Sequence, residues 1–137
     1  MIAYIVRGDA LVAFLHENDA DPVFESGLQV PAGTVQDGED LADAVLREAF
    51  EETGLSGLRI VRYLGHDEIT WPGSDPQLRH FFHLEADAAP DEWRHVERDE
   101  GDGLPRPFRL FWLPRASAPL LVAAQGVFVS RIDDAPT

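Results

Sequence analysis

Two short apolar runs open the chain and predict its first element. Residues 3–7 and 10–15 are rich in β-branched, aliphatic and aromatic side chains, and Gly8-Asp9 lies between them. Two such runs joined by a two-residue turn that contains glycine are typical of a β-hairpin.

Further apolar runs continue this pattern along the chain. The stretches with strand-like composition are residues 28–30, 58–65, 66–71, 77–85 and 109–113. We expect 58–65 and 66–71 to be two strands that meet at a bend, and the Pro- and Gly-containing residues 71–76 to be a loop. The acidic residues 86–107 have the composition of a long loop. Helical spacing over residues 119–132 predicts a terminal helix.

The one strong helix signal runs from Asp40 to Gly54. Asp40, followed by Asp43 three residues later, is typical of an N-cap, and Gly54 stands where a left-handed C-terminal cap is needed. At about 100° per residue, one broad face is apolar and should be buried: Ala42, Val45, Leu46, Ala49 and Phe50. Mixed strands with two helices predict one domain over residues 1–137 of the α/β (α+β) class.

Composition and charge narrow the function. With 25 acidic residues against 11 basic ones, the formal net charge is −14, which repels polyanions and argues against nucleic-acid binding. The chain has no cysteine, so thiolate metal sites and cysteine nucleophiles are excluded. No apolar run approaches the length of a membrane span, and the N-terminus lacks the layout of a signal peptide, so a cytoplasmic protein is expected.

The predicted helix carries three glutamates on a second face, at positions 48, 51 and 52. Residues three and four apart are neighbours on a helix, so these carboxylates repel one another, although Arg47 can brace Glu51. They also lie near the C-terminal end, where the helix dipole disfavours negative charge. They are either a solvated face or ligands of a hard divalent cation such as Mg²⁺ or Mn²⁺.

The spacing of these residues resembles the signature of the Nudix hydrolases. It runs from Gly33 through Glu39, Arg47-Glu48 and Glu51-Glu52 to Gly54 and the aliphatic Leu55. One departure is Ala49, where the family prefers a larger aliphatic residue, and this affects packing behind the helix rather than chemistry. The resemblance implies an α/β/α sandwich with a mixed sheet and a catalytic helix.

The resemblance also implies an activity and a set of site residues. Nudix enzymes use Mg²⁺ or Mn²⁺ to hydrolyse a nucleoside diphosphate linked to another moiety, such as ADP-ribose, a dinucleoside polyphosphate, a nucleotide sugar or a nucleoside triphosphate. The implied metal ligands are Glu48, Glu51, Glu52 and the backbone carbonyl of Ala32. Arg47 and Glu39 are implied as a pair that orients these glutamates. Gly33 would let the backbone approach the metal.

The resemblance does not identify the general base. Some family members use a glutamate of the motif, which here is Glu48, and others use an acidic residue of a later loop. The candidates on residues 86–103 are Glu92, Glu97 and Glu100.

Substrate recognition should depend on residues outside the motif. Trp71-Pro72 faintly resembles the ADP-ribose hydrolases, and Arg79, Trp71 and Trp93 are candidate substrate-binding residues. Phe81 and Phe82 are further candidates for stacking on a base, with His80 or His83 near phosphate. The alternative function is a catalytically silent Nudix-fold module that binds a nucleotide as a sensor. The expected partner is a small nucleotide, not nucleic acid or a membrane, and the resemblance leaves a homodimer open.

Overall fold

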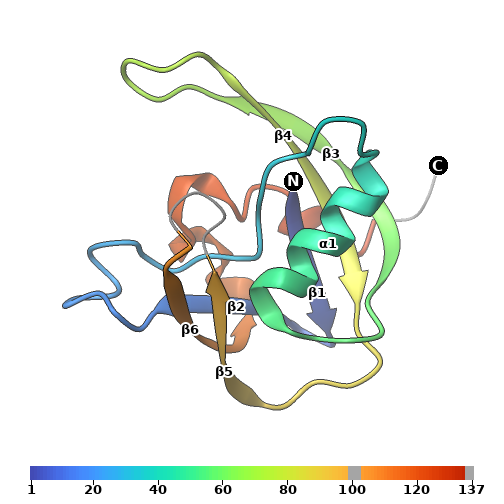
Figure 1. Ribbon diagram of the computed structural model, residues 1–137. Helices are drawn as coiled ribbons and strands as arrows, with labels where there is room; N and C mark the ends of the chain where they lie inside the picture. The colour runs from blue at the N-terminus through green and yellow to red at the C-terminus, as the bar shows by residue number, and fades with distance from the viewer. Residues whose placement is uncertain (99–102, 135–137) are drawn as a thin grey trace.

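The computed structural model describes residues 1–98 and 103–134 of the 137-residue chain. Within these residues, six strands form one sheet in the order β3-β4-β1-β2-β6-β5 (Figure 1). The strands are β1 (Ile2–Arg7), β2 (Ala10–His16), β3 (Arg59–Ile69), β4 (Gln77–Glu85), β5 (Glu92–Arg98) and β6 (Pro105–Pro114). Strands β1 and β4 are parallel and the other neighbouring pairs are antiparallel, so the sheet is mixed.

The predicted hairpin is confirmed, and it opens around a later segment. Strands β1 and β2 pair beside their turn, at Val6–Leu11 and Arg7–Ala10. Farther from the turn, residues 29–32 lie between them, where Gln29 bridges to Phe14 and Ala32 bridges to Ile2. The prediction of a regular strand over residues 28–30 is therefore wrong, because this segment makes isolated bridges. Its position holds Ala32 and Gly33 beside the beginning of β1.

Strand β3 is one continuous element, so the prediction of two strands meeting at a bend is wrong. Register shifts at Ile60/Arg62 and Tyr63/Gly65 absorb the bend while pairing with β4 continues. A bulge of this kind increases local twist without ending the strand. The predicted strand 77–85 is confirmed with its bounds, and the β3–β4 hairpin projects beyond the body of the molecule (Figure 1).

The acidic segment 86–107 is not a single loop, as the sequence suggested, because it contains β5 and the beginning of β6. Half-buried and exposed residues alternate strictly along β5, with Trp93, His95 and Glu97 on the half-buried side. Only one of these three inward residues is hydrophobic, so hydropathy does not mark the strand. Strand β5 lies at the sheet edge and pairs with β6 along its whole length.

Helix α1 (Leu41–Thr53) covers one face of the sheet, and the C-terminal segment covers the other (Figure 1). The prediction of a terminal α-helix is wrong. The segment forms three 3₁₀ turns: η1 (Arg115–Leu120), η2 (Val122–Ala124) and η3 (Val129–Arg131). Pro119 lacks an N–H, and Ala123 and Ala124 have left-handed φ values of 53° and 52°, so a continuous helix cannot pass through them.

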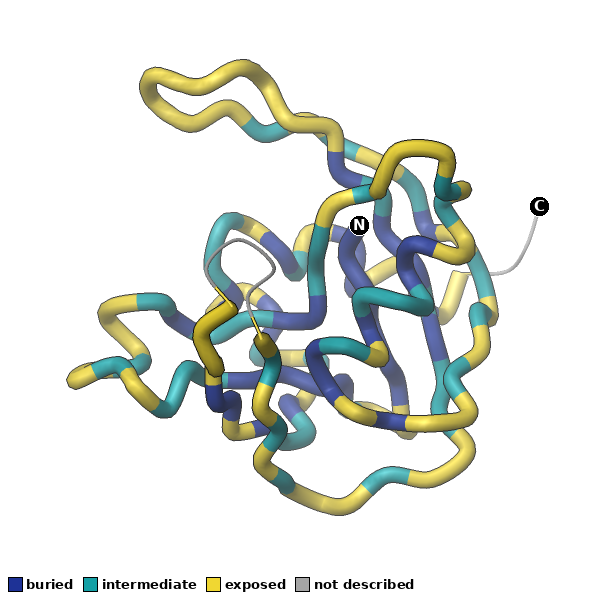
Figure 2. The backbone as a smooth tube through the Cα atoms, in the orientation of Figure 1, coloured by how far each residue is buried: buried dark blue, intermediate teal, exposed yellow. Residues whose placement is uncertain are grey.

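The core has two parts, one on each face of the sheet (Figure 2). Tyr4, Phe81 and Phe128 belong to the part under the C-terminal segment. Phe82 and Val45 belong to the part under α1. The aromatic rings of Phe81 and Phe82 are thus committed to the core on opposite faces. Among the described residues, no helix is both long and apolar enough to cross a bilayer.

Candidate active site

Helix α1 begins and ends where its sequence predicts. The Asp40 side chain accepts a hydrogen bond from the Asp43 N–H at 2.8 Å, and Gly54 ends the helix with φ 72°. The predicted buried face is partly wrong, because Ala42 is exposed and Phe50 is 55% exposed. The buried residues are Ala44, Val45, Ala49, Glu52 and Thr53.

The true buried face includes a catalytic candidate. Val45, Ala49 and Glu52 have the i, i+4, i+7 spacing of one helix stripe, so Glu52 points toward the sheet and is only 7% exposed. Its Oε1 accepts a hydrogen bond from the backbone N–H of Ala32 at 2.9 Å. This contact joins the helix to the segment that lies between β1 and β2.

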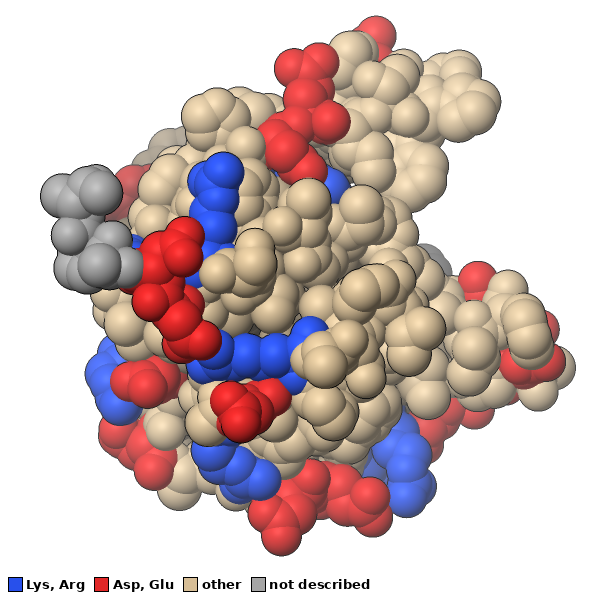
Figure 3. All heavy atoms as spheres, turned by 180° about the vertical axis from the view of Figure 1, so that it is seen from behind, with Lys and Arg blue, Asp and Glu red and all other residues tan. Residues whose placement is uncertain are grey.

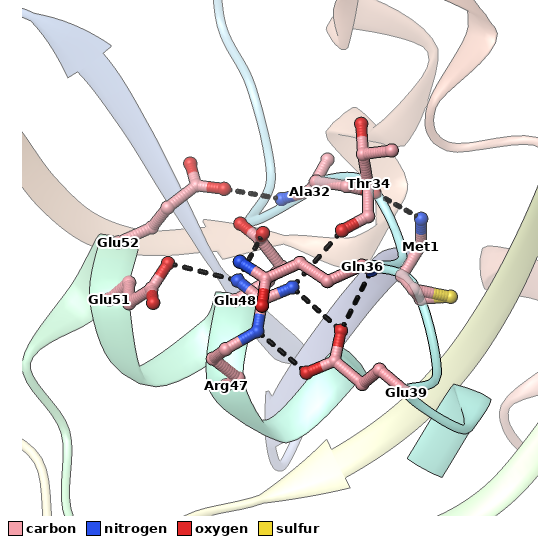
Figure 4. A network of polar contacts seen from close by, with 10 residues as sticks. Met1, Ala32, Thr34, Gln36, Glu39, Arg47, Glu48, Glu51 and Glu52 are labelled. Carbon is pink, nitrogen blue, oxygen red and sulfur yellow. Dashed lines mark hydrogen bonds and ion pairs between the residues drawn. The ribbon is translucent and has the colours of Figure 1, made fainter. Parts of the chain in front are cut away.

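Arg47 is the centre of the polar network in Figure 4. Its Nε and Nη2 donate to the two oxygens of Glu39 at 2.7 and 2.9 Å, and Nη1 donates to Glu48 at 2.7 Å and to Glu51 at 3.2 Å. Nη2 also donates to the carbonyl of Thr34 at 3.1 Å. The two-pronged pairing with Glu39 fixes the plane of the guanidinium, which in turn fixes two motif glutamates.

The charge of Glu39 is strongly stabilised. Hydrogen bonding from Arg47, followed by the N–H of Gln36, lowers the pKa of the Glu39 carboxyl to about 2. The same contact raises the pKa of Arg47 above its ordinary value. The pair is therefore ionised throughout the physiological range.

The charge of Glu52 is strongly disfavoured. Burial raises the pKa of Glu52 well above its ordinary value, and the negative charges of Glu97, Glu48 and Glu51 raise it further. The hydrogen bond from Ala32 opposes this shift. A carboxyl with this surrounding is stabilised in its charged form by a nearby cation.

Gly33 provides room for Glu48. A Cβ placed on Gly33 would lie 2.0 Å from Glu48 Cδ, so any side chain there would displace the carboxylate. The Gly33 N–H donates to the Met1 carbonyl at 3.0 Å, which anchors this backbone at the beginning of β1.

Strand β5 contacts the last turn of α1. The Trp93 indole N–H donates to the Thr53 carbonyl at 2.9 Å, and His95 Nε2 lies 2.9 Å from the Glu51 carbonyl. These contacts satisfy carbonyls that a helix end leaves without intrahelical partners. The structure therefore places Trp93 at the helix end, outside the walls of the pocket described below.

Two of the three candidate bases of the acidic segment, Glu92 and Glu97, lie within the described residues and have different surroundings. Glu97 lines a cleft with Glu51 between β5 and α1, and its charge acts on Glu52. Glu92 has a side chain that is 66% exposed and lies 3.5 Å from Arg109. Glu100 lies outside the described residues.

A pocket of about 410 Å³ adjoins the motif backbone. Its walls include Ala32, Gly33, Trp71, Arg79 and Gln125. Two of the candidate substrate-binding residues, Trp71 and Arg79, are thus brought to one cavity beside the glutamates.

Arg79 is held firmly within that wall. Its Nε and Nη2 donate to the two oxygens of Asp67 at 2.8 and 2.7 Å, and Nη1 donates to the carbonyl of Ala123. His80 also lines the pocket, and its Nδ1 lies 2.9 Å from the Tyr63 hydroxyl. Burial lowers the pKa of His80, which favours the neutral ring.

The donor chemistry fits a hard divalent cation. Among the residues that the structure describes, no three acidic or histidine side chains are grouped as ligands of one ion: Glu48 and Glu51 turn toward Arg47, and Glu52 toward Ala32. The three carboxylates and the Ala32 carbonyl nevertheless offer the oxygen donors that Mg²⁺ and Mn²⁺ prefer, and the positive charges among them are those of Arg47 and the Met1 ammonium, which donates to the Gly33 carbonyl. The raised pKa of Glu52 and the space that Gly33 leaves at Glu48 also fit a bound cation. The residues that would hold it are Glu48, Glu51, Glu52 and the Ala32 carbonyl.

Comparison with known protein families agrees with the fold and the motif. The family model of the NUDIX domain matches residues 3–131, which is nearly the whole chain. The chain therefore belongs to the Nudix family. Membership indicates hydrolysis of pyrophosphate bonds as the general type of activity.

Two features of the site were not found by sequence reasoning. Gln125 lines the pocket from within a segment that was expected to be a helix. His95 reaches the helix end from within an expected loop. The sequence did offer one signal for the burial of Glu52: Val45, Ala49 and Glu52 have the i, i+4, i+7 spacing of one helix face.

Proposed function

We propose that this protein is an Mg²⁺- or Mn²⁺-dependent pyrophosphohydrolase that acts on a nucleoside diphosphate linked to another moiety. One observation carries the proposal: α1 brings Glu52 and Glu48 to the backbone at Ala32-Gly33, where a pocket begins, and Arg47 links Glu48 to Glu51. A bound divalent cation would neutralise phosphate oxygens and lower the pKa of a water molecule. The chain supplies the groups that hold and orient these partners.

The roles of the chain's own residues follow from their contacts. Arg47, fixed by Glu39, holds Glu48 and Glu51 on one side of the helix. The Ala32 N–H holds Glu52, which is one turn after Glu48 on the helix. Such preorganisation is what a charged transition state needs, because the oxygen donors then do not have to reorganise during the reaction.

Two residues are candidates for the general base. Glu48 is supported by its place beside Gly33, where the backbone leaves room for it. Glu97 is supported by its place on β5, across the cleft from Glu51 and close enough to influence Glu52. The location of Glu92 beside Arg109 favours a surface role for that residue.

The size and lining of the pocket support a small nucleotide as substrate. Trp71 lines the pocket, which agrees with the faint likeness of Trp71-Pro72 to the ADP-ribose hydrolases. All 11 basic residues are arginines, and on the face opposite α1 they lie among acidic groups (Figure 3). This distribution does not favour a nucleic-acid substrate. A cytoplasmic location and a homodimer remain part of the proposal.

A catalytically silent sensor is the alternative function. The complete set of motif glutamates favours the enzyme, since a module that only binds nucleotide has no need for three carboxylates that repel one another. A sensor would bind a nucleotide in the same pocket without turnover.

The test is hydrolysis of a nucleotide panel with Mg²⁺ or Mn²⁺. The panel contains ADP-ribose, dinucleoside polyphosphates, NADH, nucleotide sugars and (deoxy)nucleoside triphosphates. We expect turnover of at least one compound and a loss of about 10²-fold or more in kcat for Glu52→Gln. The matched control is Glu92→Gln, an exposed glutamate that should retain full activity. Absence of turnover by a folded protein that binds the metal would favour the sensor.

A further inference from the structure

Gln125 is a buried polar residue in the wall of the pocket beside the glutamates. It is 8% exposed and reaches the cavity from the turn that follows η2. A buried amide normally has partners for its polar atoms, since an unpaired one costs about 1–3 kcal/mol. Its contacts therefore show which atom is available to a ligand.

Three polar atoms of Gln125 are committed within the protein. Its Oε1 accepts from the Val30 N–H at 3.0 Å, its backbone carbonyl accepts from the Tyr4 hydroxyl, and its N–H donates to the Val122 carbonyl at 2.9 Å. Tyr4 is itself fully buried, and its hydroxyl accepts from the Phe128 N–H at 3.2 Å. The Val30 N–H can only donate, so the amide orientation is fixed with Nε2 as the remaining donor.

Among the described residues, Gln125 Nε2 has no hydrogen-bond partner. Because Gln125 lines the pocket and this NH₂ group is the donor left on its side chain, we take the NH₂ group as the donor for a ligand that enters there. Two features restrain the turn that carries it: Ala123 and Ala124 have left-handed backbone conformations, and the Ala123 carbonyl accepts a hydrogen bond from Arg79. The donor is thereby held in one place.

The rest of the lining favours a planar, largely apolar group. Ile69, Trp71, Leu78 and Val35 contribute apolar side chains to the walls. Within the described part of the chain, the lining holds two cationic groups, and both already have partners: the Arg79 guanidinium pairs with Asp67, and the Met1 ammonium donates to the Gly33 carbonyl at 2.5 Å and lies near Glu48 and Glu52. Neither is a free cation of the kind that holds a phosphate. A heterocyclic base, with apolar faces and acceptors on its edge, matches these walls.

We propose that this pocket binds the nucleobase of the substrate and that Gln125 Nε2 donates a hydrogen bond to an acceptor on the edge of the base. Trp71 contributes aromatic surface against which the base packs. The inference rests on the proposed function, because it assumes a nucleotide ligand. It adds that the nucleoside half, and not the second moiety, lies between Trp71 and Gln125.

The first test is a binding measurement that needs no turnover. Isothermal titration calorimetry would compare AMP, GMP, CMP and UMP with ribose 5-phosphate, which has the same sugar phosphate and no base. We expect at least one nucleotide to bind about 10-fold or more tightly than ribose 5-phosphate. Equal affinity for all five compounds would overturn the proposal.

The second test changes only the donor. Gln125→Glu keeps an oxygen for the Val30 N–H and replaces the NH₂ group by an acceptor, so the preferred nucleotide should lose about 10- to 100-fold in affinity while ribose 5-phosphate is unaffected. For a variant that folds poorly, the same loss is measured on wild-type protein with deaza analogues of the preferred nucleotide. An unchanged affinity for every such analogue would overturn the role of Gln125.

The two tests can fail independently of the proposed enzymatic activity. A protein that hydrolyses the panel without preferring nucleotides to ribose 5-phosphate refutes the base pocket alone. A protein that binds a base through Gln125 and hydrolyses nothing refutes the enzyme and keeps the pocket.

Discussion

The Glu52 carboxylate accepts a hydrogen bond from the backbone N–H of Ala32 at 2.9 Å, across 20 residues of chain. One partner lies in the last turn of α1, and the other lies in the segment between β1 and β2. The contact joins the two ends of the Nudix motif, because Ala32 immediately precedes its first glycine, Gly33, and Glu52 lies near its end. It also places the acid on the buried side of the helix, where its negative charge is costly.

We predict that Glu52→Gln stabilises the metal-free protein while it lowers kcat by about 10²-fold or more. The glutamine oxygen keeps the bond from Ala32, and the buried charge disappears. Because burial raises the pKa of Glu52 in the folded state, the wild type loses stability relative to the variant as pH rises above about 4.5, the ordinary value. At neutral pH, urea unfolding in EDTA should show a gain of about 1–3 kcal/mol for the variant.

Addition of Mg²⁺ should reverse this order. The wild type gains stability from a bound cation and the variant gains less, because one carboxylate ligand is gone. If the variant is less stable than the wild type in EDTA, the buried negative charge of Glu52 does not destabilise the metal-free protein, and the prediction is wrong.

We predict that Gly33→Ala impairs catalysis far more than folding. The added Cβ would lie 2.0 Å from Glu48 Cδ, at the flexible end of that side chain, so the carboxylate can move aside at small cost to the fold. Its displacement should lower kcat by about 10²-fold, as misplaced catalytic groups do. Steady-state kinetics and thermal unfolding of the same preparation would measure both effects.

The matched control is Gly38→Ala in the same loop. A Cβ there meets no atom within 4 Å, but φ is +78°, so the expected effect is a small loss of stability with kcat retained. Equal activity of the Gly33→Ala variant and the wild type would show that Glu48 does not need its observed position.

We predict that Glu97→Gln lowers activity and that Glu92→Gln does not. Both are glutamates of β5, but Glu97 lies on the side that faces α1, and Glu92 lies beside Arg109 on the surface. If Glu97 is the base, kcat should fall by about 10²- to 10⁴-fold, and the acidic limb of the pH–rate profile should disappear. Retained activity would leave Glu48 as the candidate, to be tested by Glu48→Gln.

We predict that Glu39 makes stability depend on pH below about 4.5. Bonding to Arg47 lowers the pKa of Glu39 from the ordinary 4.5 to about 2 in the folded protein. Its contribution is therefore fully present above the unfolded-state pKa and is lost as pH falls through the folded-state value. Acid titrations of wild type and Glu39→Gln, followed by circular dichroism, should converge as pH approaches 2.

Convergence is the diagnostic feature of that experiment, because the many other carboxylates titrate in both proteins. A constant difference in unfolding free energy between pH 5 and pH 2 would show that Glu39 acts through packing and not through its charge.

Local features of the sequence determined the elements whose signals lie within a few residues. The turn at Gly8-Asp9, the caps at Asp40 and Gly54, and the alternating run of β4 need no distant partner to be recognised. The spacing of the motif likewise identified the family, and the resemblance to that family implied the pairing of Arg47 with Glu39 that the structure shows.

Tertiary structure decided what depends on contacts between distant segments. Strand β5 carries charged residues at most of its positions, and its pairing with β6 and its contacts with α1 determine its place. The C-terminal segment has helical spacing, yet close packing at Gly126, where a Cβ would lie 2.5 Å from the Ala118 carbonyl, and the left-handed alanines divide it into turns. The burial of Glu52 and the position of Gln125 in the pocket wall likewise depend on contacts between distant segments. Hydropathy reports whether a residue type is usually buried or exposed. The site depends on polar residues, such as Glu52 and Gln125, that tertiary packing buries although their types are usually exposed.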